Sequence, residues 1–366
     1  MKVAFVGKNF KTKYSGGRIH AWMMANAFAA QEHQVDFYTN IKPSFADELS
    51  IYSGKEKIRL LISSIFFFLQ SGKYDLIVLV PHLASKKSFI IDKFLFYPLV
   101  KRLKKASKCP VWYIDFESPN WIGEMVPGAR SESAYEYSNR ALQYVDTILS
   151  TTKEGMKYAR AYYSKFNAGL NYKQLYLGIN SKIAEGFVSS EKTRKVVYFG
   201  RFNEKHKNAG VLNNIVKAVP EGYTLLVIGN KDRLAPDLYQ SLVNEARAGK
   251  VNLVFRSDIS ESEKYSELAS AQLLLYSSTF EGYGLPPIEA QYVNTPVLCS
   301  AIPVLQEVNA KADFVDFADL EALKKLVHKI LNQKLAPNEL HNYVSSFAGF
   351  EQYAVNLNRL LNDISK

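Results

Sequence analysis

Cysteine is scarce in this chain of 366 residues, and the two that occur, Cys109 and Cys299, fall in different halves. Two distant thiols give no disulfide framework, so the sequence predicts free thiols in a reducing, cytoplasmic environment. Long apolar runs are also lacking. The longest, residues 60–69, contains two serines and is well below the ~20 residues that span a bilayer. We therefore expect a soluble or peripheral protein.

Motifs for metal binding are absent as well. No group of His, Cys and carboxylate residues has metal-ligand spacing, and no Asp-x-Asp follows a predicted strand, so we expect neither metal nor cofactor. The net charge is +11, and such an excess attracts anions such as nucleotide sugars or anionic lipid. No basic stretch carries a recognised nucleic-acid-binding motif, so nucleic acid is not an expected partner.

Strand-like and helix-like segments alternate along the chain, which predicts an α/β fold with parallel sheets. The chain is too long for one ordinary core and therefore suggests two domains. Strands are expected at Lys2–Gly7, Tyr74–Pro81 and Pro110–Ile114 among others, and residues 56–70 are expected to form a helix.

The most informative stretch is SSTFEGYGLPPIEA, residues 277–290. A short apolar run, Leu273–Tyr276, predicts a buried strand before it, and Leu285–Val293 has apolar residues at helical spacing after two early prolines. Gly282 and Gly284 allow a tight turn that brings backbone N–H groups close to a ligand. Because a helix N-terminus carries partial positive charge, this strand–loop–helix unit favours an anion such as a phosphate.

Two carboxylates belong to the same unit, Glu281 in the loop and Glu289 in the helix. A carboxylate accepts hydrogen bonds from two hydroxyls, as the vicinal diols of sugars present them. Taken singly, Glu281 could be an ordinary loop charge and Glu289 a first-turn acid that favours the helix dipole. Together with the glycines, they favour a binding site.

Residues Glu281 to Glu289 resemble the E-x7-E signature of retaining nucleotide-sugar glycosyltransferases of family 4, and the similarity continues through Thr295–Ser300 and Pro303–Val308. The resemblance implies the GT-B fold, with two Rossmann-like domains whose parallel sheets face an interdomain cleft. It implies that Glu281 faces the donor sugar hydroxyls and Glu289 the nucleotide ribose. It further implies that the loop between them contacts the donor through Gly282, Tyr283, Gly284 and Leu285.

Gly200-Arg201 and Lys207 resemble the family's Gly-Arg…Lys motif, which implies that both cations bind the donor diphosphate. Fixed cations and N–H donors must stabilise a departing nucleoside diphosphate when no metal is present. Arginine offers a bidentate fork to phosphate oxygens, and lysine a mobile point charge. Arg201, Lys207 and Glu281 are therefore the candidate catalytic residues, although either cation alone could be a solvated surface charge.

Three further places are candidates for donor contacts. Gly16 and Gly17 precede a predicted helix from about residue 19, where the family has a Gly-Gly facing the diphosphate. Gly229 closes a predicted strand at residues 223–228. Arg256 and Ser257 follow the next strand, where relatives place the nucleobase but commonly have glycine, so base contacts there are open.

Acceptor-side candidates follow the strand that ends at Ile114. Ligands of open α/β sheets bind beyond the carboxyl ends of strands. Asp115 and Glu117 are candidates for orienting the acceptor hydroxyl, and Trp121 for stacking on a sugar face. Loop capping and core packing account for these residues equally well. Many family members have histidine where this chain has Ile114, so no base role is carried over to it.

Residues 85–105 interleave aromatic, aliphatic and basic side chains. Such a stretch either lies on an anionic membrane or forms a helix packed on the sheet with a solvated basic face. Because family members often use lipid-linked acceptors, the resemblance favours contact with the inner face of the cell membrane. The expected domains are residues 1–178, with a terminal helix at 350–366 packing back on them, for the acceptor, and residues 179–349 for the donor.

These features predict a metal-independent, retaining transfer of a hexose from a UDP- or GDP-sugar to a hydroxyl of a glycan or lipid-linked acceptor, in cell-surface polysaccharide or glycolipid synthesis. The alternatives are a nucleotide-sugar epimerase or hydrolase with the same fold, and a non-catalytic module that binds nucleotide or membrane. Donor turnover with and without an acceptor distinguishes the three.

Overall fold

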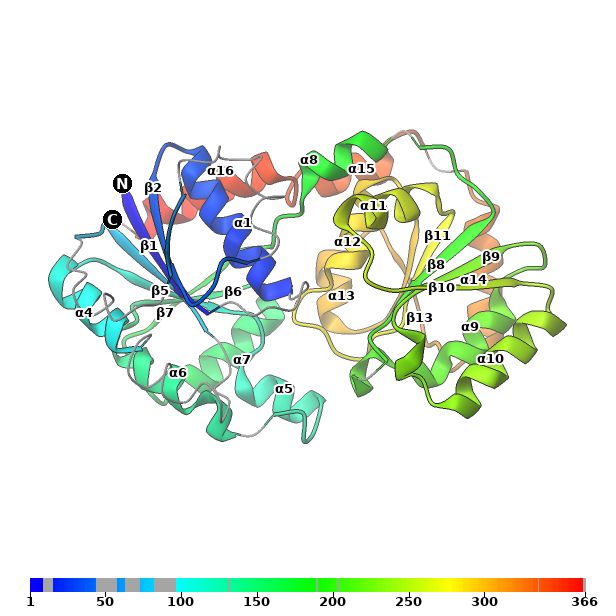
Figure 1. Ribbon diagram of the computed structural model, residues 1–366, viewed down its shortest axis with the longest axis horizontal. Helices are drawn as coiled ribbons and strands as arrows, with labels where there is room; N and C mark the ends of the chain where they lie inside the picture. Colours follow the sequence, from blue (N-terminus) through cyan, green and yellow to red (C-terminus); the bar gives the residue numbers. More distant parts are fainter. Residues whose placement is uncertain are drawn as a thin grey trace. The chain divides into compact units, whose positions relative to one another are not determined.

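The computed structural model describes residues 1–8, 16–43, 58–62, 73–81, 97–130, 132–188, 190–202, 204–334 and 336–364. The chain forms two compact units, residues 1–178 with 350–366 and residues 179–349. Each is an α/β unit built on a parallel sheet (Figure 1).

The first unit has a parallel sheet in the order β3-β2-β1-β4-β5-β6-β7. Its strands are β1 (Lys2–Gly7), β2 (Gln34–Thr39), β3 (Ile58–Ile62), β4 (Leu76–Val80), β5 (Val111–Asp115), β6 (Thr147–Ser150) and β7 (Asn171–Gln174). Every residue of β4 and β5 is buried. Both are near-continuous apolar runs because helices cover a parallel sheet on both faces.

Two sets of helices cover this sheet. One face packs against α1 (Gly16–Ala30) and the C-terminal helix α16 (Phe350–Ile364). Gln31, just after α1, donates its Nε2 to the carbonyl of Ala354 in α16 at 2.7 Å. The other face packs against α4 (Tyr97–Ser107), α6 (Glu136–Ala141) and α7 (Lys153–Tyr163). The short helix α5 (Pro119–Met125) packs against α7.

The helix predicted at residues 56–70 is wrong where the structure describes it. Residues 58–62 form β3, which pairs in parallel with β2, and residues 63–70 lie outside the described residues. A short apolar run does not distinguish a strand from a buried helix, and a partner strand distant in the sequence decides the outcome. Arg59 of β3 adds a bidentate contact with Asp36 of β2, at 2.8 and 2.7 Å.

The second unit has a six-stranded parallel sheet in the order β10-β9-β8-β11-β12-β13. Its strands are β8 (Lys195–Phe199), β9 (Thr224–Ile228), β10 (Asn252–Arg256), β11 (Leu273–Tyr276), β12 (Val297–Ser300) and β13 (Asp313–Val315). The strand order reverses between β8 and β11. In open α/β sheets, ligands bind at such a switch point, beyond the carboxyl ends of the strands.

Helices cover both faces of this sheet too (Figure 1). One face packs against α9 (Leu212–Ala218), α10 (Pro236–Ala248) and α14 (Leu320–Leu331). On the other side lie α11 (Glu261–Ser270), α12 (Leu285–Tyr292) and α13 (Pro303–Val308), with α8 (Ser181–Ala184) and α15 (Glu339–Ser345) packed on them.

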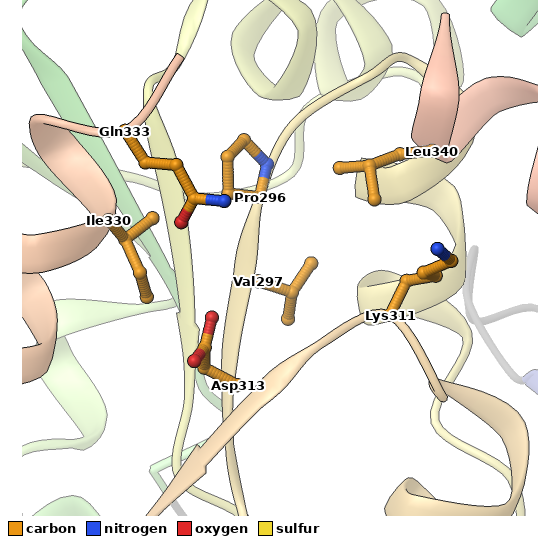
Figure 2. Close-up of a pocket in the computed structure, with 7 residues that line it drawn as sticks. All are labelled: Pro296, Val297, Lys311, Asp313, Ile330, Gln333 and Leu340. Atoms are coloured by element: carbon orange, nitrogen blue, oxygen red, sulfur yellow. The ribbon is translucent and has the colours of Figure 1, made fainter. Parts of the chain in front are cut away.

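A small cavity lies at the other end of this sheet, where β12 and β13 begin. Figure 2 shows its lining of Pro296, Val297, Lys311, Asp313, Ile330, Gln333 and Leu340. Its volume of about 40 Å³ has room for roughly three waters. It is too small for a sugar or a nucleotide, so the candidate site is not here.

Candidate active site

The carboxyl ends of β8 and β11 bring together two candidate residues that are distant in the sequence. Lys207 ends a 3-10 turn (Lys205–Lys207) in the loop after β8, and Glu281 lies in the loop after β11. The two strands are parallel neighbours, so both loops leave the sheet at the same edge. The Lys207 Nζ is 2.5 Å from the Glu281 Oε1.

The charges of this pair are largely removed from water. The side chains of Lys207 and Glu281 are 7% and 10% exposed. Tyr276, the last residue of β11, donates its Oη to the same Oε1 at 2.5 Å. Burial alone would raise the pKa of Glu281, but the charge of Lys207 and the hydrogen bonds from Lys207, Ser278 and Tyr276 hold it below its ordinary value. Glu281 is therefore an ionised carboxylate in a buried setting.

Backbone contacts hold the two loops against each other. Thr279 donates its N–H to the carbonyl of His206 at 2.8 Å, and Tyr198 of β8 donates its Oη to the carbonyl of Lys207 at 3.1 Å. Asn208 ends the lysine turn with a left-handed φ of 56°, a conformation that asparagine tolerates. The loop that carries Lys207 is thus fixed to the loop that carries Glu281 and to β8.

Arg201 lies in the same loop as Lys207 but does not join the buried pair. Its side chain is 65% exposed, and its guanidinium contacts Glu204 at 3.0 Å. Asn203, between them, lies outside the described residues. The exposed guanidinium keeps open donors, because a guanidinium carries five N–H groups.

The glycine loop is closely packed at Gly284, the N-cap of α12. Its φ is +89°, and a Cβ at this position would lie 2.6 Å from the Leu305 Cδ2 of α13. The positive φ strongly favours glycine, and a Cβ would also displace the Leu305 side chain. Prolines follow in the first turn of the helix, where they are accepted. Gly282 and Leu285 flank this position, and the side chain of Tyr283 is buried, at 4% exposure.

Glu289, on α12, is buried and paired with a lysine that the sequence did not single out. Lys264 Nζ lies 2.8 Å from the Glu289 Oε1, and it also contacts Glu261. Burial raises the pKa of Glu289, the charge of Lys264 opposes this, and the neighbouring Glu261 adds to the rise. Lys264 and Glu261 are one helical turn apart, a spacing typical of any exposed helix, so no sequence signal distinguished them.

Gly229 and Gly200 meet where β9 and β8 end. A Cβ on Gly229 would lie 2.3 Å from the carbonyl oxygen of Gly200, so only glycine fits. Arg256, which ends β10, contacts Glu267 and Glu263 of α11, both at 2.6 Å. Its guanidinium therefore contacts α11, and its predicted contact with the donor stays a prediction. Ser257 is exposed at this edge.

In the first unit, Gly16 and Gly17 begin α1, earlier than the predicted start of that helix. A Cβ on Gly17 would lie 3.0 Å from the ring of Phe116, in the loop after β5. The helix start and that loop are thus in close contact. Their predicted part in binding a diphosphate stays a prediction.

Asp115 lies at the carboxyl end of β5 but below the surface, at 2% exposure. Tyr163 donates its Oη to Oδ1 at 2.9 Å, and Ser150 lies 3.5 Å from Oδ2. Burial raises the pKa of Asp115 to about 7, against the Tyr163 hydrogen bond and with a further rise from Glu117. These hydrogen bonds of Asp115 thus lie within the first unit. Its predicted role in orienting an acceptor hydroxyl stays a prediction.

Glu117 and Trp121 are also engaged within the first unit. Glu117 pairs with Arg130 at 2.8 Å. Trp121 is 2% exposed, and its ring stacks on Tyr158 with an interplanar angle of 14°. The ring of Trp121 therefore packs against protein, the second of the two expected uses, and its stacking on a sugar stays a prediction.

The basic stretch is described only from Tyr97 onward, and residues 85–96 lie outside the described residues. Over residues 97–105, the apolar side chains belong to the core, with Tyr97, Leu99, Val100 and Leu103 buried. Lys101 and Lys105 are exposed. For this part, the helix packed on the sheet is the observed arrangement.

Neither a metal site nor a membrane-spanning helix is found in the described ranges. No group of His, Cys, Asp and Glu there has an arrangement that would hold a metal ion. None of the helices in those ranges is both long and apolar enough to cross a membrane.

Part of the chain is similar to known proteins. Residues 180–347 match the family model described as glycosyl transferases group 1. A stretch of 143 residues is 32% identical to the O-antigen chain mannosyltransferase RfbU of Salmonella typhimurium, and covers 39% of this chain and 40% of that protein. The chain thus spans less than half the length of that relative.

Solved structures resemble the whole chain. Sucrose-phosphate synthase from Thermosynechococcus elongatus aligns over 99% of this chain and 98% of its own, with 18% identity and a TM-score of 0.70. Anabaena Alr3699/HepE in complex with UDP and glucose aligns over 99% and 100%, with 12% identity and a TM-score of 0.67. At these identities the similarity shows the fold, and the predicted α/β GT-B architecture is confirmed.

Proposed function

We propose that the protein transfers a hexose from a UDP- or GDP-sugar to a hydroxyl, with retention of the anomeric configuration. The match of residues 180–347 to the family model described as glycosyl transferases group 1 supports this proposal. The observation that carries the proposal is the buried contact between Lys207 and Glu281 beside the glycine loop. It combines a cation suited to a diphosphate with a carboxylate suited to sugar hydroxyls.

The chemistry divides among the residues as follows. The ammonium of Lys207 has three N–H donors, so its bond to Glu281 leaves others for a diphosphate oxygen. The exposed guanidinium of Arg201 and the positive end of the α12 dipole add positive charge. Glu281 accepts hydrogen bonds from the donor sugar, and Glu289 from the ribose. None of these roles requires a metal.

In the proposed step, the bond from the anomeric carbon to the diphosphate oxygen breaks as the acceptor oxygen bonds to that carbon on the same face. The proton of the acceptor hydroxyl passes to the departing oxygen. Lys207 and Arg201 lower the free energy of the charge that develops on the diphosphate. Because the acceptor oxygen bonds on the face that the diphosphate leaves, the configuration is retained, and no protein nucleophile is required.

The acceptor is proposed to be a glycan or lipid-linked hydroxyl in cell-surface polysaccharide synthesis. The support is the similarity to a protein named as an O-antigen chain mannosyltransferase. A lipid-linked acceptor would bring the enzyme to the inner face of the cell membrane. The exposed Lys101 and Lys105 of α4 would then meet anionic headgroups through charge, since the apolar side of that helix is buried.

Titration calorimetry and thermal unfolding with UDP, GDP and their hexose derivatives test the proposal. One nucleotide class should bind, and at a hundredfold excess over its Kd should stabilise the fold by about 2.7 kcal/mol. Donor turnover should require an acceptor, and NMR of the product should show the anomeric configuration of the donor.

Lys207→Met should abolish turnover. Lys217→Met, which removes the same charge from an ion pair between α9 and α10, is the matched control. Absence of nucleotide binding, or full turnover by Lys207→Met, would refute the proposal. Free sugar or an isomerised donor formed without acceptor would instead indicate a hydrolase or an epimerase.

A further inference from the structure

Lys264 lies between two buried carboxylates of the second unit. Its Nζ donates to Oε1 and Oε2 of Glu261 at 2.8 and 2.9 Å, and to Oε1 of Glu289 at 2.8 Å. The three side chains are 13%, 11% and 8% exposed, respectively. An ammonium group has three hydrogen-bond donors, so this lysine is fully engaged by the two carboxylates.

The helices that carry these residues are themselves fixed. A capping box between Ser260 and Glu263 holds the first turn of α11, the turn to which Glu261 belongs. Thr295, just beyond α12, donates its Oγ1 to the carbonyl of Leu268 in α11 at 2.7 Å. The contact between Lys264 and Glu289 therefore joins two anchored helices.

The charges explain why a lysine is needed at this place. Two carboxylates that share a buried site without a cation repel each other, and one of them takes up a proton. A protonated Glu289 would lose part of its capacity to accept hydrogen bonds. Lys264 compensates one of the two negative charges and fixes one oxygen of Glu289, which leaves the carboxylate further acceptor positions.

We propose that Lys264 is a positioning residue for the donor nucleotide: it holds Glu289 as a carboxylate that receives the vicinal hydroxyls of a ribose. The inference rests on the proposed function, in which Glu289 meets the nucleoside. It assigns selectivity for ribonucleotides over 2′,3′-dideoxynucleotides to a contact between α11 and α12, and gives Glu261 the role of fixing the lysine.

Titration calorimetry with UDP and GDP and with their 2′,3′-dideoxy analogues tests this inference. The wild type should bind the ribonucleotide more tightly. Lys264→Met should weaken ribonucleotide binding about ten- to hundredfold, the size expected for hydrogen bonds to a charged group, and should leave dideoxynucleotide binding nearly unchanged. Lys264→Arg should retain most of the preference, and Lys217→Met should retain all of it.

A second set of variants keeps the inference open to refutation if Lys264→Met does not fold. Glu261→Gln keeps an amide oxygen that can accept from Lys264, so the lysine stays fixed and the ribose preference should persist, whereas its loss would overturn the inference. Adding Lys264→Met to Glu289→Gln should cause no further loss, because both act through one contact.

Equal weakening of both ligands by Lys264→Met would show a merely structural lysine and overturn the inference. An unchanged preference in that variant would overturn it too. If the wild type binds no nucleotide at all, the proposed function itself fails. If the wild type binds nucleotide and prefers the ribonucleotide, and Lys264→Met shows the same preference, the proposed function stands and only the role of Lys264 fails.

Discussion

Lys207→Met tests the centre of the candidate site because it removes a buried charge and keeps most of the side-chain volume. In the structure, the Lys207 Nζ and the Glu281 Oε1 are 2.5 Å apart, and both side chains are at most 10% exposed. The variant leaves Glu281 without its cation. Removing one partner of a buried ion pair costs about 3–5 kcal/mol, because the remaining charge is uncompensated.

The loss is large enough to measure by thermal unfolding. For a unit of this size, residues 179–349, 1 kcal/mol shifts the Tm by roughly 2–4 °C, so Lys207→Met should lower it by about 6–20 °C. Tyr276→Phe removes the neutral donor on the same oxygen and should cost less, about 1.5–3 kcal/mol. If the only role of Lys207 were contact with substrate, its replacement by methionine would lower turnover and leave the Tm unchanged.

The double variant Lys207→Met/Glu281→Gln separates the two effects. It removes both charges, so the Tm should recover most of its loss, while turnover stays absent. Two single-variant losses that add up in the double variant would refute the pairing, because residues in contact are expected to be non-additive.

The pH dependence gives an independent check. In the wild type, the pKa of Glu281 lies below its ordinary value of 4.5, so its contribution to stability persists above that pH and is lost only as the pH falls further. Without Lys207, burial raises this pKa, and ionisation of Glu281 then costs stability as the pH rises. The Tm difference between wild type and Lys207→Met should therefore grow from about pH 5 to about pH 8. A constant difference would refute the reasoning.

Two further predictions concern burial and backbone. Because burial raises the pKa of Asp115 to about 7 from an ordinary 3.8, its contribution to stability should fall as the pH rises between these values, and Asp115→Asn should remove that slope from Tm measurements. Gly284→Ala should cost at least about 1–2 kcal/mol in chemical denaturation, since its φ is +89° and its Cβ would meet Leu305. Gly123→Ala in α5, where a Cβ meets nothing within 4 Å, is the control and should be neutral or stabilising.

The sequence predicted the second unit well because its signals are local. The glycine loop, the two prolines and the apolar run before them specify strand, loop and helix at residues 273–292, and β11 and α12 form there. The resemblance named from these residues agrees with the family model described as glycosyl transferases group 1, which matches residues 180–347. Beyond this region, predictions depended on contacts that the sequence does not display.

One prediction failed where a distant partner decides the structure: residues 58–62 become a strand because β2 pairs with them. For Trp121 the sequence left sugar stacking and core packing open, and its ring packs against Tyr158, 37 positions later in the chain. For Arg256 the base contact was also open, and two glutamates of the following helix contact its guanidinium. The sequence displays none of these contacts, because each depends on tertiary packing.

The same reasoning explains why Glu281, Glu289 and Lys207 were found from the sequence and Lys264 was not. Glu281 and Glu289 stand in a local signature, whereas Lys264 reaches Glu289 only because α11 packs against α12. A buried carboxylate needs a partner, so each predicted carboxylate already implied a cation without naming it. Lys207 could be named because a second motif contained it. Lys264 belongs to no motif, and its position between Glu261 and Glu289 is visible only in the folded chain. Searching a structure for the cations of predicted carboxylates is therefore a direct way to complete a site that a signature describes in part.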